Sequence, residues 1–399
     1  MIYILFDGVN AEKSAKVHGG GNFARWITNE INTYIYENQL AEMFSLGVLW
    51  PKGVLPQTAE EKAIFENKSY IINEIESINE VVFNIEDILF IPVGESCHVD
   101  LERLKDEYPE LIIKTVIHGI RNYDLLRYES YQKYYHTWYK PLPGMGALSY
   151  FRQIRNFKRE IKKVRSACKV SSEIFTDTNN SLQLIIKLAN PKRIQYYHPA
   201  TLIDTSYGKT GEYIFNEKYM LLINANRVEK NSLRTLVAFF KYKLENPNET
   251  LKFYMVGMNS HMKSVVKYIK GISPEFVHNE IKMFDYVDSD ELKELFRQSY
   301  FLIYPSKSEG YGLPLLDAME CGIPIVATRF TSVPEVLGTA AYYVDPFDTN
   351  SICEGICFMS SPDNNKYYRK RINEIRPVVR KRLELDKRAM VEDILEIRK

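Results

Sequence analysis

The chain has 399 residues, of which 45% are hydrophobic and 26% are charged, and this balance is typical of a globular protein with room for two ordinary domains. The net charge is +1, so the sequence predicts no overall electrostatic attraction to nucleic acid. The 5 cysteines are odd in number and form no CxxC pair, which argues against a disulfide framework and a structural zinc site. We therefore expect a reducing, cytoplasmic location. No apolar run is long enough to cross a bilayer, so any membrane contact is expected to be peripheral.

The amino-terminal half is predicted to alternate strands and helices. Apolar runs predict strands at 2–6, 44–49, 87–92 and 111–117, with helical patterns around 60–78 and 99–107. Such alternation predicts a doubly wound parallel sheet.

Two features lie beyond the ends of these predicted strands. A glycine loop containing Gly20 and Gly21 follows the first strand and precedes a helical pattern, so its amides can face a diphosphate. A flexible turn is the alternative, because the spacing is not GxGxxG. His118 follows the strand at 111–117, and ligands of open α/β sheets bind beyond the carboxyl ends of strands. A packed or solvated histidine is the alternative there.

Residues 151–169 form a predicted helix with a basic outer surface. Phe151, Ile154, Phe157, Ile161 and Val164 lie on one apolar face, and Glu160 is the only acidic residue among many lysines and arginines. Such a helix either lies on an anionic membrane, or faces an anionic lipid-linked acceptor, or is an ordinary surface helix packed on the sheet.

The carboxy-terminal half repeats the α/β pattern. Residues 198–216 are interpreted as an interdomain connection. Beyond it the sequence predicts strands at 219–224, 251–256, 281–284 and 301–304, and a helix at 233–240. The predicted fold is α/β, with two Rossmann-like domains facing across a cleft. The predicted boundaries are a first domain at 1–205, a second at 206–375, and a basic helix at 376–399 that is either solvated or crosses back to the first domain.

Arg227 and Lys230 lie where a predicted strand hands over to a helix. Their two cations suit a negatively charged ligand such as a departing diphosphate, with a solvated loop as the alternative. The run Asp288-Ser289-Asp290 formally matches a metal-holding DxD pattern, but a helical pattern follows it directly. We therefore interpret Asp288 as a helix cap and predict that the protein needs neither a metal nor a cofactor.

The segment 304–346 is the strongest candidate site. Gly310 and Gly312 flank Tyr311 in a loop that a ligand can approach closely, and Glu309 precedes them.

A helix is predicted to start at Pro314, with Asp317 in its first turn, and to end at a left-handed Gly322. Amides at such a helix start attract phosphate, and two carboxylates suit sugar hydroxyls. The alternative is that both carboxylates only complement the helix dipole.

The chain resembles the retaining GT-B glycosyltransferases of group 1, which are carbohydrate-active family four. The resemblance rests on NANRVEKN, on SEGYGLPLLDAMECGIPIVAT and SVPEVLGTAAYYVDP in the second half, and on GGGNFARW and VIHG in the first. It implies a transfer of a hexose-type sugar, with retention, from a UDP- or GDP-linked donor to a hydroxyl of a glycan, lipid-linked or protein acceptor. A nucleotide-sugar epimerase of the same fold and a catalytically silent binding subunit are the alternatives.

The resemblance also implies roles for individual residues. Arg227 and Lys230 would bind the donor diphosphate, Glu309 would contact the transferred sugar, and His118 would lie near the reacting sugar. Donor contacts are implied for Gly20, Gly21, Gly310, Tyr311, Gly312, Leu313 and Asp317, the last toward the ribose.

Overall fold

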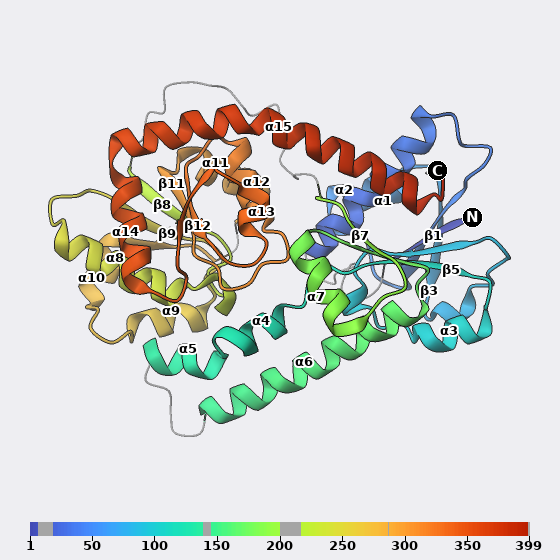
Figure 1. Cartoon of the computed structure of the whole chain (residues 1–399), viewed down its shortest axis with the longest axis horizontal. Coiled ribbons are helices and arrows are strands. Elements are labelled where there is room, and N and C mark those ends of the chain that lie inside the picture. The colour runs from blue at the N-terminus through green and yellow to red at the C-terminus, as the bar shows by residue number, and fades with distance from the viewer. Residues whose placement is uncertain (7–18, 139–144, 200–216, 286, 398–399) are drawn as a thin grey trace. The chain divides into compact units, whose positions relative to one another are not determined.

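The computed structural model describes residues 1–6, 19–138, 145–199, 217–285 and 287–397. Two compact units are present, and each contains one parallel β-sheet (Figure 1). The first unit comprises residues 1–120, 158–202 and 380–399, and the second comprises 121–157 and 203–379. The prediction of two parallel α/β sheets is confirmed.

The first unit has a sheet of seven strands in the order β3-β2-β1-β4-β5-β6-β7, all parallel. The strands are β1 Ile2–Leu5, β2 Leu46–Pro51, β3 Tyr70–Ile75, β4 Ile88–Ile91, β5 Ile112–Val116, β6 Glu173–Thr176 and β7 Ile194–Tyr196. The helices are α1 Gly19–Glu37, α2 Ala59–Glu66, α3 Leu101–Glu107 and α7 Asn179–Ala189. Side chains alternate along β1, so Ile2 and Ile4 enter one apolar core and Leu5 enters another.

The predicted helix at 60–78 is wrong in its second half. A capping box between Thr58 and Glu61 starts α2, but the helix ends at Glu66, and residues 70–75 form the edge strand β3 beside β2. The sequence of β3, Tyr-Ile-Ile-Asn-Glu-Ile, is rich in β-branched and aromatic residues, which favour a strand. The four strands predicted in this half are observed within two residues at each end, whereas β6 and β7 were not predicted.

The second unit has six parallel strands in the order β10-β9-β8-β11-β12-β13. They are β8 Tyr219–Leu222, β9 Lys252–Met255, β10 Ile281–Met283, β11 Phe301–Tyr304, β12 Ile325–Thr328 and β13 Ala341–Val344. The accompanying helices are α4 Arg121–Tyr128, α5 Tyr131–Trp138, α8 Ser232–Glu245, α9 Ser260–Lys267, α10 Pro274–Glu280, α11 Ser289–Gln298, α12 Leu313–Glu320, α13 Val333–Leu337 and α14 Thr349–Ser360. The four strands and the helix predicted here are confirmed.

Two long helices have residues in both units. These are α6, Met145–Val170, and α15, Pro362–Ile394, which contains Pro377 in its interior. The far end of α15 completes the core of the first unit, where Met390, Val391 and Ile394 pack with residues of β1, β2 and α1. Among the described residues, no helix combines the length and the apolar character needed to cross a membrane.

The strand order reverses once in each sheet, between β1 and β4 in the first unit and between β8 and β11 in the second. In open parallel sheets, ligands bind beyond the carboxyl ends of the strands at this switch point. The residues that follow β8 and β11 are therefore the first place to look for a site in the second unit.

Candidate functional site

Lys230 and Glu309 meet at the switch point of the second unit. Lys230 ends the short 3₁₀ turn Val228–Lys230 that follows β8, and Glu309 lies in the loop that follows β11. The Lys230 Nζ atom is 2.5 Å from Glu309 Oε1 and 2.5 Å from the hydroxyl oxygen of Tyr304. The side chains of Lys230 and Glu309 are only 6% and 9% exposed, so this is a nearly desolvated ion pair. The structure thus brings together two of the residues predicted for the site.

The loops that carry this pair are tied together by their backbones. The carbonyl of Glu229 accepts hydrogen bonds from the Lys307 amide at 2.7 Å and from the Ser306 hydroxyl at 2.9 Å. The side-chain amide of Asn231 donates to the carbonyls of Pro305 at 3.1 Å and Pro346 at 2.6 Å. Both ends of the 304–346 segment are therefore attached to the turn that carries Lys230.

Arg227 is an exposed cation beside this pair. It precedes the 3₁₀ turn, and among the described residues its guanidinium has no hydrogen-bond or ion-pair partner. The neighbouring Glu229 is buried and bonded to Arg121 Nη1 at 2.9 Å. Burial would raise the pKa of Glu229, but Arg121 and Lys230 lower it below its usual value. Arg227 makes a smaller contribution to this lowering through its charge, and its exposed guanidinium remains accessible to an anion.

The loop at 310–313 needs a glycine at position 312. Gly312 has a φ of +95°, and an added Cβ would lie 2.8 Å from Leu315 Cδ1. Helix α12 begins at Leu313, so Pro314 is its second residue rather than its first. Asp317 consequently lies in the second turn, and the prediction that it lies in the first turn is wrong. The left-handed Gly322, with a φ of +68°, is confirmed.

Asp317 carries an unsatisfied carboxylate oxygen. Its Oδ1 atom is buried and has no hydrogen-bond partner among the described residues. Burial, with a smaller effect of the nearby Glu320, raises the pKa of Asp317 to about 7. An acceptor atom in this condition is suited to a hydroxyl donor from a ligand.

His118 follows β5 in the first unit and is held on both sides. Its Nδ1 atom is 2.9 Å from Asp177 Oδ2, and its Nε2 atom is 3.0 Å from the carbonyl oxygen of Pro92. Burial would lower the pKa of His118, but the carboxylates of Asp177 and Glu95 raise it to about 9. Only a protonated imidazole donates from both nitrogens, so His118 is a fixed cation rather than a proton acceptor.

Gly20 and Gly21 belong to the first turn of α1 instead of a loop, because the helix begins at Gly19. The expectation of a glycine loop is wrong for these residues, while the segment 7–18 lies outside the described residues. The ring of Phe23, on the same helix, contacts the His118 ring edge-on with centroids 4.7 Å apart. The start of α1 therefore lies next to His118.

The DxD match proves to be a helix cap, as predicted. Asp288 precedes α11, and its Oδ1 atom accepts a hydrogen bond from the Glu291 amide at 2.8 Å. Independence from a metal stays a prediction.

Sequence reasoning missed several partners of the candidate residues. Asp177 follows β6 directly, and a polar residue just after a strand is a signal that would have placed it beside His118. Tyr304 ends β11, where its sequence context is that of an ordinary core residue. Nothing in the sequence therefore indicated its hydrogen bond with Lys230.

A model of a known protein family matches the segment that carries the Lys230–Glu309 pair. Residues 218–361 match the family model described as Glycosyl transferases group 1. This segment belongs to the group 1 glycosyltransferase family. It contains β8, β11 and α12, and so it includes Arg227, Lys230, Glu309 and Asp317.

Two curated relatives of the chain are O-antigen chain mannosyltransferases by name. Over 72 residues, 18% of this chain and 19% of the relative, the chain is 43% identical to O-antigen chain mannosyltransferase B of Escherichia coli. Over 135 residues, 34% of this chain and 36% of the relative, it is 27% identical to O-antigen chain mannosyltransferase RfbU of Salmonella typhimurium. The chain therefore aligns with well under half the length of these relatives.

Solved structures match the whole fold. A glycosyltransferase from Rickettsia africae ESF-5 superposes with a TM-score of 0.62 over 99% of this chain and 98% of that chain, at 16% sequence identity. At this identity the match establishes the fold alone. The chain, with its two parallel α/β sheets, has the GT-B fold.

Proposed function

We propose that the protein is a retaining glycosyltransferase that moves a mannosyl or related hexosyl group from a nucleotide diphosphate donor to a hydroxyl of a glycan or lipid-linked acceptor. The observation that carries the proposal is the buried contact of Lys230 with Glu309 and Tyr304 at the β8–β11 switch point, inside the group 1 segment. The names of the relatives support mannose and a surface polysaccharide.

In this proposal the charged groups contact different parts of the donor. Arg227, exposed and unpaired among the described residues, binds the diphosphate together with Lys230. Glu309 accepts hydrogen bonds from hydroxyls of the transferred sugar, while Asp317 accepts one from the ribose through its free oxygen. Amides of the 310–313 loop supply neutral donors to the phosphates.

The proposed chemistry follows from these contacts. The bond between the anomeric carbon and the phosphate oxygen breaks as the acceptor hydroxyl attacks the same face, and the leaving phosphate takes the hydroxyl proton. Arg227 and Lys230 stabilise the negative charge that grows on the leaving group, which is where preorganised cations have their largest effect. The sugar oxygen shares the positive charge on the anomeric carbon, and Glu309 keeps the ring oriented.

A donor screen tests the function. Mass spectrometry follows the slow hydrolysis of UDP-, GDP- and ADP-linked mannose and glucose without acceptor, and NMR of a transfer product reports the anomeric configuration. We expect one donor to be cleaved, and Arg227→Ala and Glu309→Gln each to lower the rate by about 10²–10³-fold.

The matched control is Lys270→Ala, which removes an exposed cation of the same unit and should leave the rate unchanged. Conversion of the donor into another nucleotide sugar would show an epimerase instead. Binding without turnover would show a silent subunit, and an inverted product would overturn the retaining mechanism. Full activity in excess chelator is expected, because no metal is assigned a role.

We also propose that the outer face of α6 contacts an anionic membrane surface. Leu148 and Phe151 are 74% and 67% exposed, whereas Ile161 and Val164 are buried, so the apolar face of this helix is packed at one end and exposed at the other. The exposed cations of the same helical face have no polar partner among the described residues; they are Arg152, Arg155, Lys158, Arg159 and Lys162. Exposed apolar side chains such as Leu148 and Phe151, lying next to several cations on one helical face, are typical of a helix that lies at a membrane interface.

Vesicle flotation tests this contact. Vesicles rich in phosphatidylglycerol should retain the protein and pure phosphatidylcholine vesicles should not, because each cation near an anionic surface contributes about 1 kcal/mol. Arg155→Glu with Arg159→Glu should abolish retention, whereas Lys267→Glu with Lys270→Glu, on α9 and just after it, should not. Equal retention of both double variants would refute the assignment of α6.

A further inference from the structure

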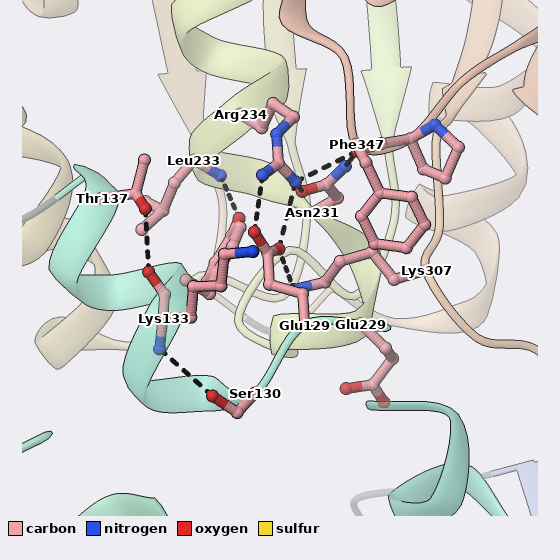
Figure 2. Close-up of polar contacts among 12 residues, drawn as sticks. Glu129, Ser130, Lys133, Thr137, Glu229, Asn231, Leu233, Arg234, Lys307 and Phe347 are labelled. Carbon is pink, nitrogen blue, oxygen red and sulfur yellow. Dashed lines mark hydrogen bonds and ion pairs between the residues drawn. The ribbon is translucent and has the colours of Figure 1, made fainter. Parts of the chain in front are cut away.

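Glu129 is a buried carboxylate held by two cations. It lies between α4 and α5, and its Oε1 atom is 2.7 Å from Arg234 Nη2 while its Oε2 atom is 3.1 Å from Lys307 Nζ. Figure 2 shows the carboxylate of Glu129 between the two cations. The side chains of Glu129, Arg234 and Lys307 are 5%, 6% and 1% exposed. Burial lowers the pKa of Lys307 to about 8 even though Glu129 opposes that change.

The two cations come from the two elements that carry the candidate donor site. Arg234 lies in the first turn of α8, just after the turn that ends in Lys230, and Lys307 lies in the loop that leads to Glu309. Arg234 Nη1 also donates to Asn231 Oδ1 at 2.9 Å. One carboxylate therefore links the turn after β8 to the loop after β11.

Other residues of the 121–138 segment contact the same two elements. Tyr134 accepts a hydrogen bond from the Leu233 amide at 2.8 Å, and its ring centroid is 3.7 Å from Lys307 Nζ. Asp124 Oδ2 accepts from the hydroxyl of Ser308 at 2.9 Å, next to Glu309. Arg121 pairs with Glu229 in the turn itself. The segment lies outside the matched residues 218–361, yet it touches both site loops.

We propose that Glu129 is a positioning residue for the donor site, which sets the spacing between Lys230 and Glu309 through Arg234 and Lys307. A buried ion cluster contributes little stability compared with apolar residues of the same volume, so its value lies in fixing one arrangement of charged groups. This inference rests on the proposed function, because the spacing matters only if a donor binds to both loops.

Nucleotide binding tests the positioning role. The probe is whichever of UDP, GDP and ADP raises the melting temperature of the wild-type protein. Glu129→Gln keeps the shape of the side chain but removes the carboxylate charge that Arg234 and Lys307 share. We expect its nucleotide Kd to rise at least about tenfold. Its rate of donor hydrolysis should fall about 10²-fold, which is the typical loss when a group of an active site is displaced by about 1 Å. The matched control is Glu280→Gln, which breaks a 2.9 Å ion pair with Lys243 at the opposite end of α8 and should leave the Kd unchanged.

A double variant separates positioning from stability. Glu129→Gln with Lys307→Met removes one unpaired buried cation, so the melting temperature should recover toward that of the wild type. The tether to the 305–309 loop is still absent, so the Kd should stay raised. A double variant that binds the nucleotide as tightly as the wild type would overturn the positioning role. Failure of all three nucleotides to stabilise the wild type would instead overturn the proposed function itself.

Discussion

Raising the pH from 6 to 10 should remove the charge of His118 and with it a measurable part of the stability of the first unit. The pKa of this group moves from an ordinary 6.5 to about 9 in the folded protein. Each tenfold change in proton affinity is worth about 1.4 kcal/mol, so the imidazolium contributes roughly 3 kcal/mol. Because the folded pKa is the higher one, this contribution is complete below pH 6.5 and is lost as the pH rises to 9.

An NMR titration of the His118 ring protons measures this directly, without requiring a two-state unfolding transition from a protein of two units. We expect a midpoint near 9 in the wild type and a much lower one in Asp177→Asn, where burial is no longer outweighed by the carboxylate. The control is Asp386→Asn, which removes the 2.6 Å partner of His198 and should leave the His118 midpoint in place. A wild-type midpoint near 6.5, or one that Asp177→Asn does not move, would refute this reasoning.

Two further changes probe the loop and helix of the 304–346 segment. Gly312→Ala should destabilise the protein by about 1–2 kcal/mol and weaken nucleotide binding, because the left-handed φ and the closeness of Leu315 both oppose a Cβ. The control is Gly271→Ala, at a φ of +81° with open space around it. In a urea melt this control measures the loss of stability that comes from the backbone conformation alone. Equal losses of stability in Gly312→Ala and Gly271→Ala would show that the contact with Leu315 has no effect. Asp317→Asn should flatten the part of the stability curve between pH 4 and 7, where the native carboxyl keeps its proton longer than the unfolded one, and should raise the nucleotide Kd; an unchanged Kd would exclude a ribose contact.

Patterns that are local in the sequence predicted the fold well. Apolar runs located β8, β9, β10 and β11 of the second unit within two residues, because strands buried on both faces are nearly continuous in apolar residues. The edge strand β3 has solvent on part of its surface, and its residues follow a helical pattern closely enough for the prediction of a helix. The same local logic recognised Asp288 as a cap and Gly322 as a helix end.

Some contacts between distant residues escaped prediction. Glu129 meets Arg234 and Lys307 across 105 and 178 residues, and nothing in the aromatic stretch around it indicates an ion cluster. The position of Asp317 depended on a helix start one residue earlier than predicted, which moved it from the first turn to the second. Pairing of Lys230 with Glu309 followed from topology, since both residues lie at the β8–β11 switch point.

The contribution of α15 to the first unit has a consequence for folding during synthesis. The core around β1 and β2 includes Met390, Val391 and Ile394, and Asp393 accepts a hydrogen bond from Gln195 at 3.0 Å. A nascent chain therefore cannot complete the unit that contains its first strand until these residues have left the ribosome. The second unit requires nothing beyond residue 379 and can close earlier. We therefore expect the first unit to fold after the second, opposite to the usual amino-terminal-first order on the ribosome, with the apolar face of α1 uncovered until then.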